Sequence, residues 1–210
     1  MKRILPLLLV LSACAALPGS TAQLERMTQA QSQGLDAQNA AEVPGDECTK
    51  EPGAPACQRI QAIRGRACLA LARKEAAEGA ACPPPSARKH LDCAVAAFAS
   101  AGGTTAGEME DKENLAENTA RARYCAAGYR STPADALQLL RQARTGLDTL
   151  APNPRRDLMN ASAALAIAQR ETVPSADATG GAPAGVVTAA QGTQNAARQL
   201  AARLGNCTGV

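Results

Sequence analysis

Eight cysteines in 210 residues constrain this chain more than any other feature of its sequence. One lies at residue 14, and the other seven are Cys48, Cys57, Cys68, Cys82, Cys93, Cys125 and Cys207. No two of them have the Cys-x-x-Cys spacing of zinc sites and reactive dithiols, and a single histidine, His90, provides no imidazole pair for a metal. In an oxidising compartment such cysteines pair, so the sequence predicts a disulfide-held fold with no metal or other cofactor.

The N-terminus indicates export into such a compartment. Lys2 and Arg3 form a positive start, and a short apolar run over residues 4–11 follows. An apolar run of about 10 residues cannot span a bilayer of roughly 30 Å, so the pattern is that of a cleaved export signal. The next residues, Leu11-Ser12-Ala13-Cys14, resemble the lipobox of bacterial lipoproteins. The resemblance implies cleavage before Cys14 and acylation of its thiol with fatty acids such as palmitate.

The residue after Cys14 is Ala15 rather than Asp, which in that family implies sorting to the outer membrane, on its periplasmic face. We therefore expect a signal peptide over 1–13, a lipidated N-terminus with a flexible tether over 14–47, and a helical domain over 48–210. Two alternatives stay open. Ordinary cleavage near Ala22 would release a secreted protein, and the proposed tether could instead be a helix packed on the domain through Leu24, Met27 and Leu35.

Helical periodicity dominates from residue 57 onward, and no segment alternates like a strand. The expected helices cover about 56–78, 86–101, 108–129 and 133–150, then one from Asn153-Pro154 and one from Val186 to Leu204. Ser86 is expected to cap the second helix and Thr132 the fourth, where Pro133 fits the first helical position. Six helices joined by short turns predict an all-α fold of three antiparallel hairpins.

Part of this pattern resembles the tetratricopeptide family of helix-pair repeats. Residues 118–154, from Asn-Thr-Ala-Arg-Ala-Arg-Tyr-Cys to Leu-Ala-Pro-Asn-Pro, look like one repeat, and similar openings fall near residues 66 and 160. The spacing is irregular, and some family positions are not met. The fold is therefore either a repeat-like solenoid or an irregular helical bundle.

Hairpin geometry gives a cysteine pairing. Cys68 and Cys93 are equally far from a turn near residue 80, and Cys82 and Cys125 are equally far from a turn near residue 104. Cys48 and Cys57 would then close a short proline-containing loop. Cys207 is left unpaired, intermolecular, or in competition for Cys57.

A rival pairing joins Cys57 to Cys93 and Cys68 to Cys82. It resembles the twin-cysteine hairpins of small mitochondrial intermembrane-space proteins. It needs a turn near Glu75, inside the strongly helix-forming stretch 72–78, so the first pairing is favoured.

Three groups of residues resemble parts of catalytic sites, and the presence of each has a simpler structural explanation. His90 is a lone helical histidine without a Gly-x-Ser-x-Gly motif. Ser86-Ala87-Arg88-Lys89 matches the Ser-x-x-Lys motif of penicillin-recognising enzymes, whose companion motifs are absent. An acidic cluster comprises Glu108, Glu110, Glu113 and Glu117. It could supply the paired carboxylates of a glycosidase, but acidic residues are also typical of a helix start, where they face the positive end of the helix dipole.

Composition narrows the function further. A net charge of +3 and only three aromatic residues argue against nucleic-acid binding, and no motif indicates a small-molecule substrate. We expect a non-enzymatic, lipid-anchored envelope protein that binds a protein partner. Family resemblance implies a scaffold in secretion, pilus or outer-membrane assembly. The alternative is an immunity or inhibitor lipoprotein that neutralises a periplasmic toxin or cell-wall hydrolase.

Overall fold

A computed structural model describes residues 19–102, 109–151 and 153–171. Within these ranges the protein is all-α, with eight α-helices, one short 3₁₀ helix and no strand. The helices are α1 (Gly19–Ser32), α2 (Asp36–Ala41), α3 (Asp46–Lys50), α4 (Pro55–Lys74), η1 (Pro85–Ala87), α5 (Arg88–Ala101), α6 (Met109–Ala127), α7 (Pro133–Asp148) and α8 (Pro154–Glu171).

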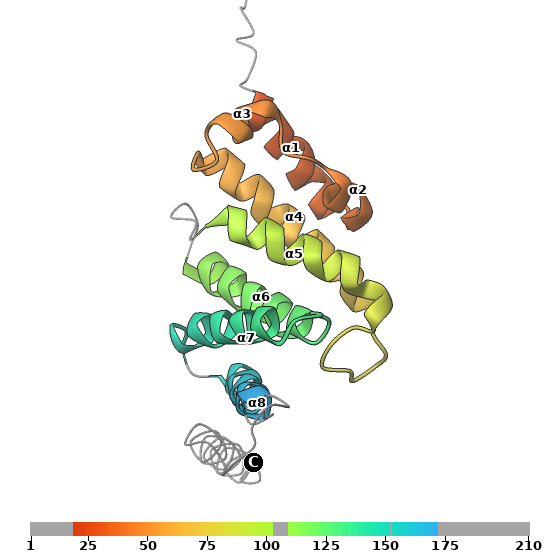
Figure 1. Cartoon of the computed structure of the whole chain (residues 1–210). Coiled ribbons are helices and arrows are strands. Elements are labelled where there is room, and N and C mark those ends of the chain that lie inside the picture. Colours follow the sequence, from red (N-terminus) through yellow and green to blue (C-terminus); the bar gives the residue numbers. More distant parts are fainter. Residues whose placement is uncertain (1–18, 103–108, 152, 172–210) are drawn as a thin grey trace, which may run out of the picture.

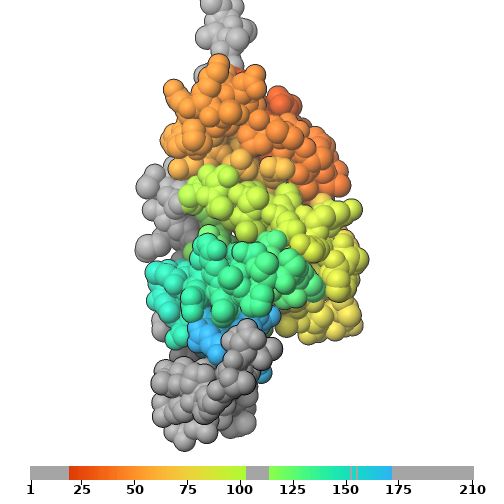
Figure 2. Space-filling view, viewed as in Figure 1, coloured from red at the N-terminus to blue at the C-terminus, as the bar shows by residue number. Residues whose placement is uncertain are grey.

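Successive helices pack as neighbours along one axis, and those from α4 to α7 are antiparallel. α4 packs on α5, α5 on α6, α6 on α7 and α7 on α8, while α1 and α2 cover the other side of α4. Figure 1 shows this order from α1–α3 at one end to α8 at the other. In the space-filling view of Figure 2 the same helices form successive bands along an elongated molecule. Antiparallel hairpins are therefore the building unit, as the sequence predicted.

The core is divided along this axis. The largest cluster joins α4, α5 and α6 through side chains such as Leu69, Leu91, Phe98 and Leu115. A second cluster, between α1, α3 and α4, contains Met27, Cys48, Cys57, Ile60 and Ile63. Smaller clusters between α6, α7 and α8 are built largely from alanine. Because alanine buries little apolar area, the disulfides contribute a large share of the cross-linking between neighbouring helices.

The segment expected to be a tether is folded from residue 19 onward. α1 carries few large apolar residues, but Met27 is only 2 % exposed and packs on the Cys48–Cys57 region, with Leu24 beside it. Asn39 of α2 is buried and its Nδ2 donates to the Met27 carbonyl at 3.1 Å. The alternative of a packed N-terminal helix is thus correct for Leu24 and Met27 and wrong for Leu35, which is exposed.

The helix boundaries agree with their local signals in most places. Thr132 caps α7, since its Oγ1 accepts a hydrogen bond from the Asp135 backbone N–H at 3.1 Å. Ser86 does not cap α5, because Pro85 and Ser86 lie in the short 3₁₀ turn η1. α4 ends at Lys74 rather than at residue 78, and Glu75 is its C-cap. The helix expected over 186–204 lies outside the described residues.

Candidate functional site

Three disulfides link neighbouring parts of the stack. Their partners are Cys48 with Cys57, Cys68 with Cys93, and Cys82 with Cys125, with Cα–Cα distances of 5.3, 5.9 and 5.3 Å. These are the pairs that hairpin geometry favours, and the rival twin-cysteine pairing does not occur. Cys68–Cys93 joins α4 to α5, and Cys82–Cys125 joins the α4–α5 connection to α6. The expected lipidation site, Cys14, and the odd cysteine, Cys207, lie outside the described residues.

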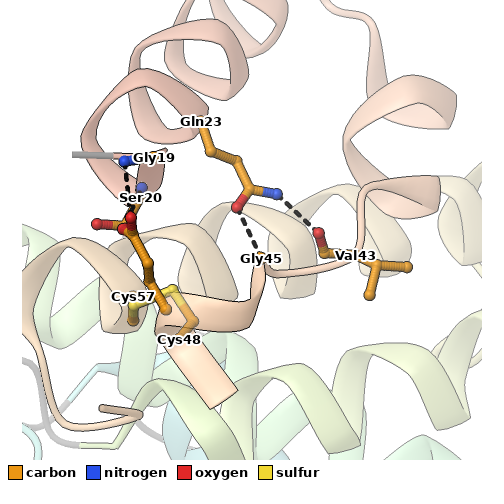
Figure 3. Close-up of a disulfide and its surroundings, with 8 residues drawn as sticks. Gly19, Ser20, Gln23, Val43, Gly45, Cys48 and Cys57 are labelled. Atoms are coloured by element: carbon orange, nitrogen blue, oxygen red, sulfur yellow. Dashed lines mark hydrogen bonds between the residues drawn. A yellow bond between two sulfur atoms is a disulfide. The ribbon is translucent and has the colours of Figure 1, made fainter. Parts of the chain in front are cut away.

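The start of the fold is fixed by a carboxylate from α3. The Glu47 Oε1 accepts a hydrogen bond from the Gly19 backbone N–H at 3.0 Å, and Oε2 accepts from the Ser20 N–H at 2.8 Å. These amides belong to the first turn of α1, which has no partner for them within its own helix. The hydrogen bond from the Ser20 backbone is the main reason that the pKa of Glu47 lies below its ordinary value. Figure 3 shows this contact close to the Cys48–Cys57 disulfide.

A buried glutamine completes the same end of the molecule. The Gln23 Nε2 donates to the Val43 carbonyl at 2.8 Å, and its Oε1 accepts from the Gly45 N–H at 3.0 Å. One α1 side chain therefore bonds two backbone groups of the connection between α2 and α3 (Figure 3). Sequence reasoning missed both Gln23 and Glu47, because neither lies in a local capping pattern. Their partners are 20 or more residues away.

A cavity of about 340 Å³ opens where α4 ends. It is bounded by Leu69 and Arg73 of α4, by the connection over residues 76–83, and by Arg121 and Cys125 of α6. Much of its wall is alanine, and Arg73 is held by a hydrogen bond to Asn118 at 3.0 Å. The connection stays in place because Cys82 is bonded to Cys125 and the Tyr129 hydroxyl donates to the Pro83 carbonyl. The cavity lining combines these alanines with charged side chains of both signs, Arg73, Arg121 and Glu78.

Ser86 and His90 meet at one carboxylate in an order that does not match a hydrolase triad. The Ser86 hydroxyl donates to Glu75 Oε2 at 2.8 Å, and His90 Nε2 lies 3.6 Å from Glu75 Oε1. In a triad the histidine stands between the nucleophile and the acid. Here Glu75 lies between Ser86 and His90, so these contacts link the end of α4 to the start of α5. Lys89 is exposed, and no contact between it and Ser86 is formed.

Glu117 acts as a link between two helices. Its carboxylate lies 3.0 Å from Arg156 Nε of α8 and 3.8 Å from Arg121 Nη2 on its own helix, and all three side chains are less than a fifth exposed. On the same helix, burial lowers the pKa of the Arg123 guanidinium. The Glu110 and Glu113 backbones lie in α6, and Glu108 lies outside the described residues. Of this acidic cluster, Glu117 is the member whose side chain the structure describes, and it faces arginines.

The described ranges contain no group of three or more histidine, cysteine or acidic side chains that could hold a metal ion. None of their helices is both long and apolar enough to cross a membrane.

Comparison with known proteins identifies no relative of this chain. No family model, no curated protein and no solved structure matches the chain.

Proposed function

We propose that this protein is an envelope lipoprotein, anchored to the outer membrane through Cys14, which serves as a non-enzymatic scaffold for a partner protein in an envelope, secretion or pilus assembly. The observation that carries the proposal is the disulfide framework. Six of the seven cysteines after residue 14 are paired, and such pairs persist in oxidising compartments such as the periplasm. The signal-like N-terminus and the lipobox resemblance supply the route and the anchor.

A role in protein binding is supported by the architecture of the stack. Helices added one after another along an axis leave long side surfaces exposed, as in other helix-pair proteins that bind peptides or helices. The cavity at the end of α4 has exposed residues in its lining, among them Ala77 and Glu78. We therefore place the partner's contact there.

The test of the anchor is chemical. The protein purified from membranes is analysed by mass spectrometry at its N-terminus, beside a Cys14→Ser variant. We expect a chain that begins at Cys14 and carries acyl groups, and a variant that is no longer lipidated. An unprocessed N-terminus, or cleavage near Ala22 without lipid, would contradict the anchored form.

The test of the partner uses the anchored protein as bait in detergent-solubilised envelope. Ala77 is exposed at the cavity, so Ala77→Arg is expected to block it, whereas Ala134→Arg places the same side chain at an exposed position of α7. We expect one partner to be retained by the parent and by Ala134→Arg and lost with Ala77→Arg. Equal retention by both variants would place the contact elsewhere. Recovery of a toxin or wall hydrolase whose activity is inhibited would replace the scaffold with an immunity function.

A further inference from the structure

We infer that the end of the molecule formed by α3 and the turn over residues 51–54 rests directly against the lipid surface in which Cys14 is anchored. This inference rests on the proposed acylation of Cys14. In this arrangement a short attachment over residues 15–18 takes the place of the flexible tether expected over residues 14–47. The partner of this surface is therefore the headgroup layer of the anchoring membrane.

The first step is the point at which folded structure begins. Gly19 and Ser20 are fixed to Glu47 of α3 by hydrogen bonds of 3.0 and 2.8 Å. Glu47 is one residue from Cys48, whose disulfide to Cys57 closes the turn after α3. The entry of the chain is thus bonded to a cross-linked part of the fold. α1 itself is held on α4 by the buried Met27.

The second step is the reach of the chain between the anchor and this point. Only residues 15–18 separate Cys14 from Gly19, so their Cα atoms can be at most about 18 Å apart. A free coil over residues 15–47 would have a mean span of about 30 Å and could extend beyond 100 Å. Four residues therefore cannot hold the domain away from the bilayer. The end that carries Gly19 must stay beside the headgroups.

The third step is the chemistry of that end. Its exposed charged residues are the acidic Asp46, Glu47 and Glu51 and a single basic Lys50, and Pro52 and Gly53 are exposed beside them. Such a surface remains in water and does not insert into the hydrocarbon, because charged groups are costly there. The contact we infer is hence apposition to headgroups. It directs the stack away from the membrane, with α7 and α8 at the far end (Figure 1).

The experiment measures the distance of two positions from the lipid. Lys50 of α3 or Arg144 of α7, both exposed, is replaced by an azide-bearing amino acid and coupled to a fluorophore, which leaves the cysteines untouched. The acylated full-length protein is placed in phosphatidylethanolamine–phosphatidylcholine vesicles with nitroxide-labelled headgroups. We expect strong quenching at position 50 and at least threefold weaker quenching at position 144. Similar quenching at the two positions would overturn the inference.

A second variant separates the short attachment from an intrinsic affinity for lipid. Thirty glycine and serine residues are inserted between Ala16 and Leu17, and the melting temperature is checked to be that of the parent. We expect the insertion to lower quenching at position 50 severalfold. Unchanged quenching would mean that the attachment length does not set the position. Mass spectrometry of the same samples reports acylation, so failure of the proposed lipidation is distinguished from failure of this orientation.

Discussion

Gly65 allows the closest approach between α4 and α5. A Cβ atom at this position would lie 2.6 Å from two carbon atoms of the Phe98 ring, nearer than any real contact. Phe98 is the only phenylalanine in the chain, and it is 3 % exposed in the main core. We predict that Gly65→Ala destabilises the protein by about 1–3 kcal/mol, because overpacking outweighs the gain in helix propensity. Chemical denaturation measures this change.

Gly146 supplies the matched control. It also lies inside a helix, but a Cβ there would meet only the Ala120 side chain, at an ordinary 4.0 Å. Gly146→Ala should therefore stabilise the protein, by up to about 1 kcal/mol. If the two substitutions shift stability in the same direction, close packing against Phe98 is not what selects glycine at position 65.

Glu47 gives the start of α1 a defined pH dependence. Its pKa is lowered in the folded state by the hydrogen bonds from Ser20 and Gly19, so it stabilises the fold above its ordinary pKa of 4.5 and loses this effect as the pH falls through its folded-state value. We predict that Glu47→Gln is less stable than the parent at pH 7. The difference should shrink toward pH 3, which melting temperatures across the pH range would show.

Glu51 is the control for this measurement, because it lies at the other end of α3 and is exposed. Glu51→Gln should leave the pH profile of stability unchanged. A constant difference between Glu47→Gln and the parent at all pH values would mean that the carboxylate charge is not what holds α1.

At the scale of elements, the sequence predicts helices best where their ends carry local signals. Thr132 and Pro133 mark the start of α7 correctly, and Gly102, in the left-handed region with φ 60°, ends α5. The sequence does not predict α2 and α3 as packed elements, and it offers the packing of α1 only as an alternative to the tether, since these helices are polar and are held by distant partners. Gln23 forms hydrogen bonds with residues 20 and 22 positions away, and the hydrophobic periodicity of the sequence cannot predict such long-range bonds.

The cysteine pairs were predictable for a related reason. Two helices joined by a short connection place residues equidistant from the turn side by side, and Cys68–Cys93 and Cys82–Cys125 satisfy this condition. The cavity at the end of α4 was not predictable, because it depends on where the chain leaves the helix after Lys74. The connection that follows is held by Cys82–Cys125 and by the hydrogen bond from Tyr129, two residues after α6, to Pro83.

The disulfides should differ in their contribution to stability. Cys82–Cys125 spans 43 residues and Cys48–Cys57 spans 9. In the chain-entropy description, the longer loop restricts the unfolded chain more, by about 4 against about 2.6 kcal/mol. We predict that the Cys82→Ala/Cys125→Ala double variant loses more stability than Cys48→Ala/Cys57→Ala in urea denaturation. The reverse order would show that the short bridge acts mainly through the folded state.

Glu117 tests the link between α6 and α8. Glu117→Gln leaves the guanidinium groups of Arg156 and Arg121 without the carboxylate that faces both. We predict a loss of about 1–2 kcal/mol, because these side chains are largely shielded from water. Exposed Glu171 pairs with Arg141 at the surface, so Glu171→Gln should cost less than 1 kcal/mol. Equal losses would indicate that shielding does not strengthen the pair.

At the scale of the whole molecule, the stack has no single core shared by all helices. The cluster around Met27 involves α1, α3 and α4, whereas the cluster around Leu140 involves α6, α7 and α8. Contacts in such a serial arrangement are mostly between neighbours, so stability is expected to vary along the axis.

Leu140→Ala and Met27→Ala together test this division. Both residues are at most 2 % exposed, and truncation of a buried leucine or methionine typically costs 2–5 kcal/mol. If the clusters are energetically separate, Leu140→Ala should speed amide hydrogen exchange at least tenfold in α7 and α8 and leave α1–α3 unchanged. Met27→Ala should do the opposite. A uniform increase throughout the helices, in both variants, would instead show that the disulfides couple the stack into one cooperative unit.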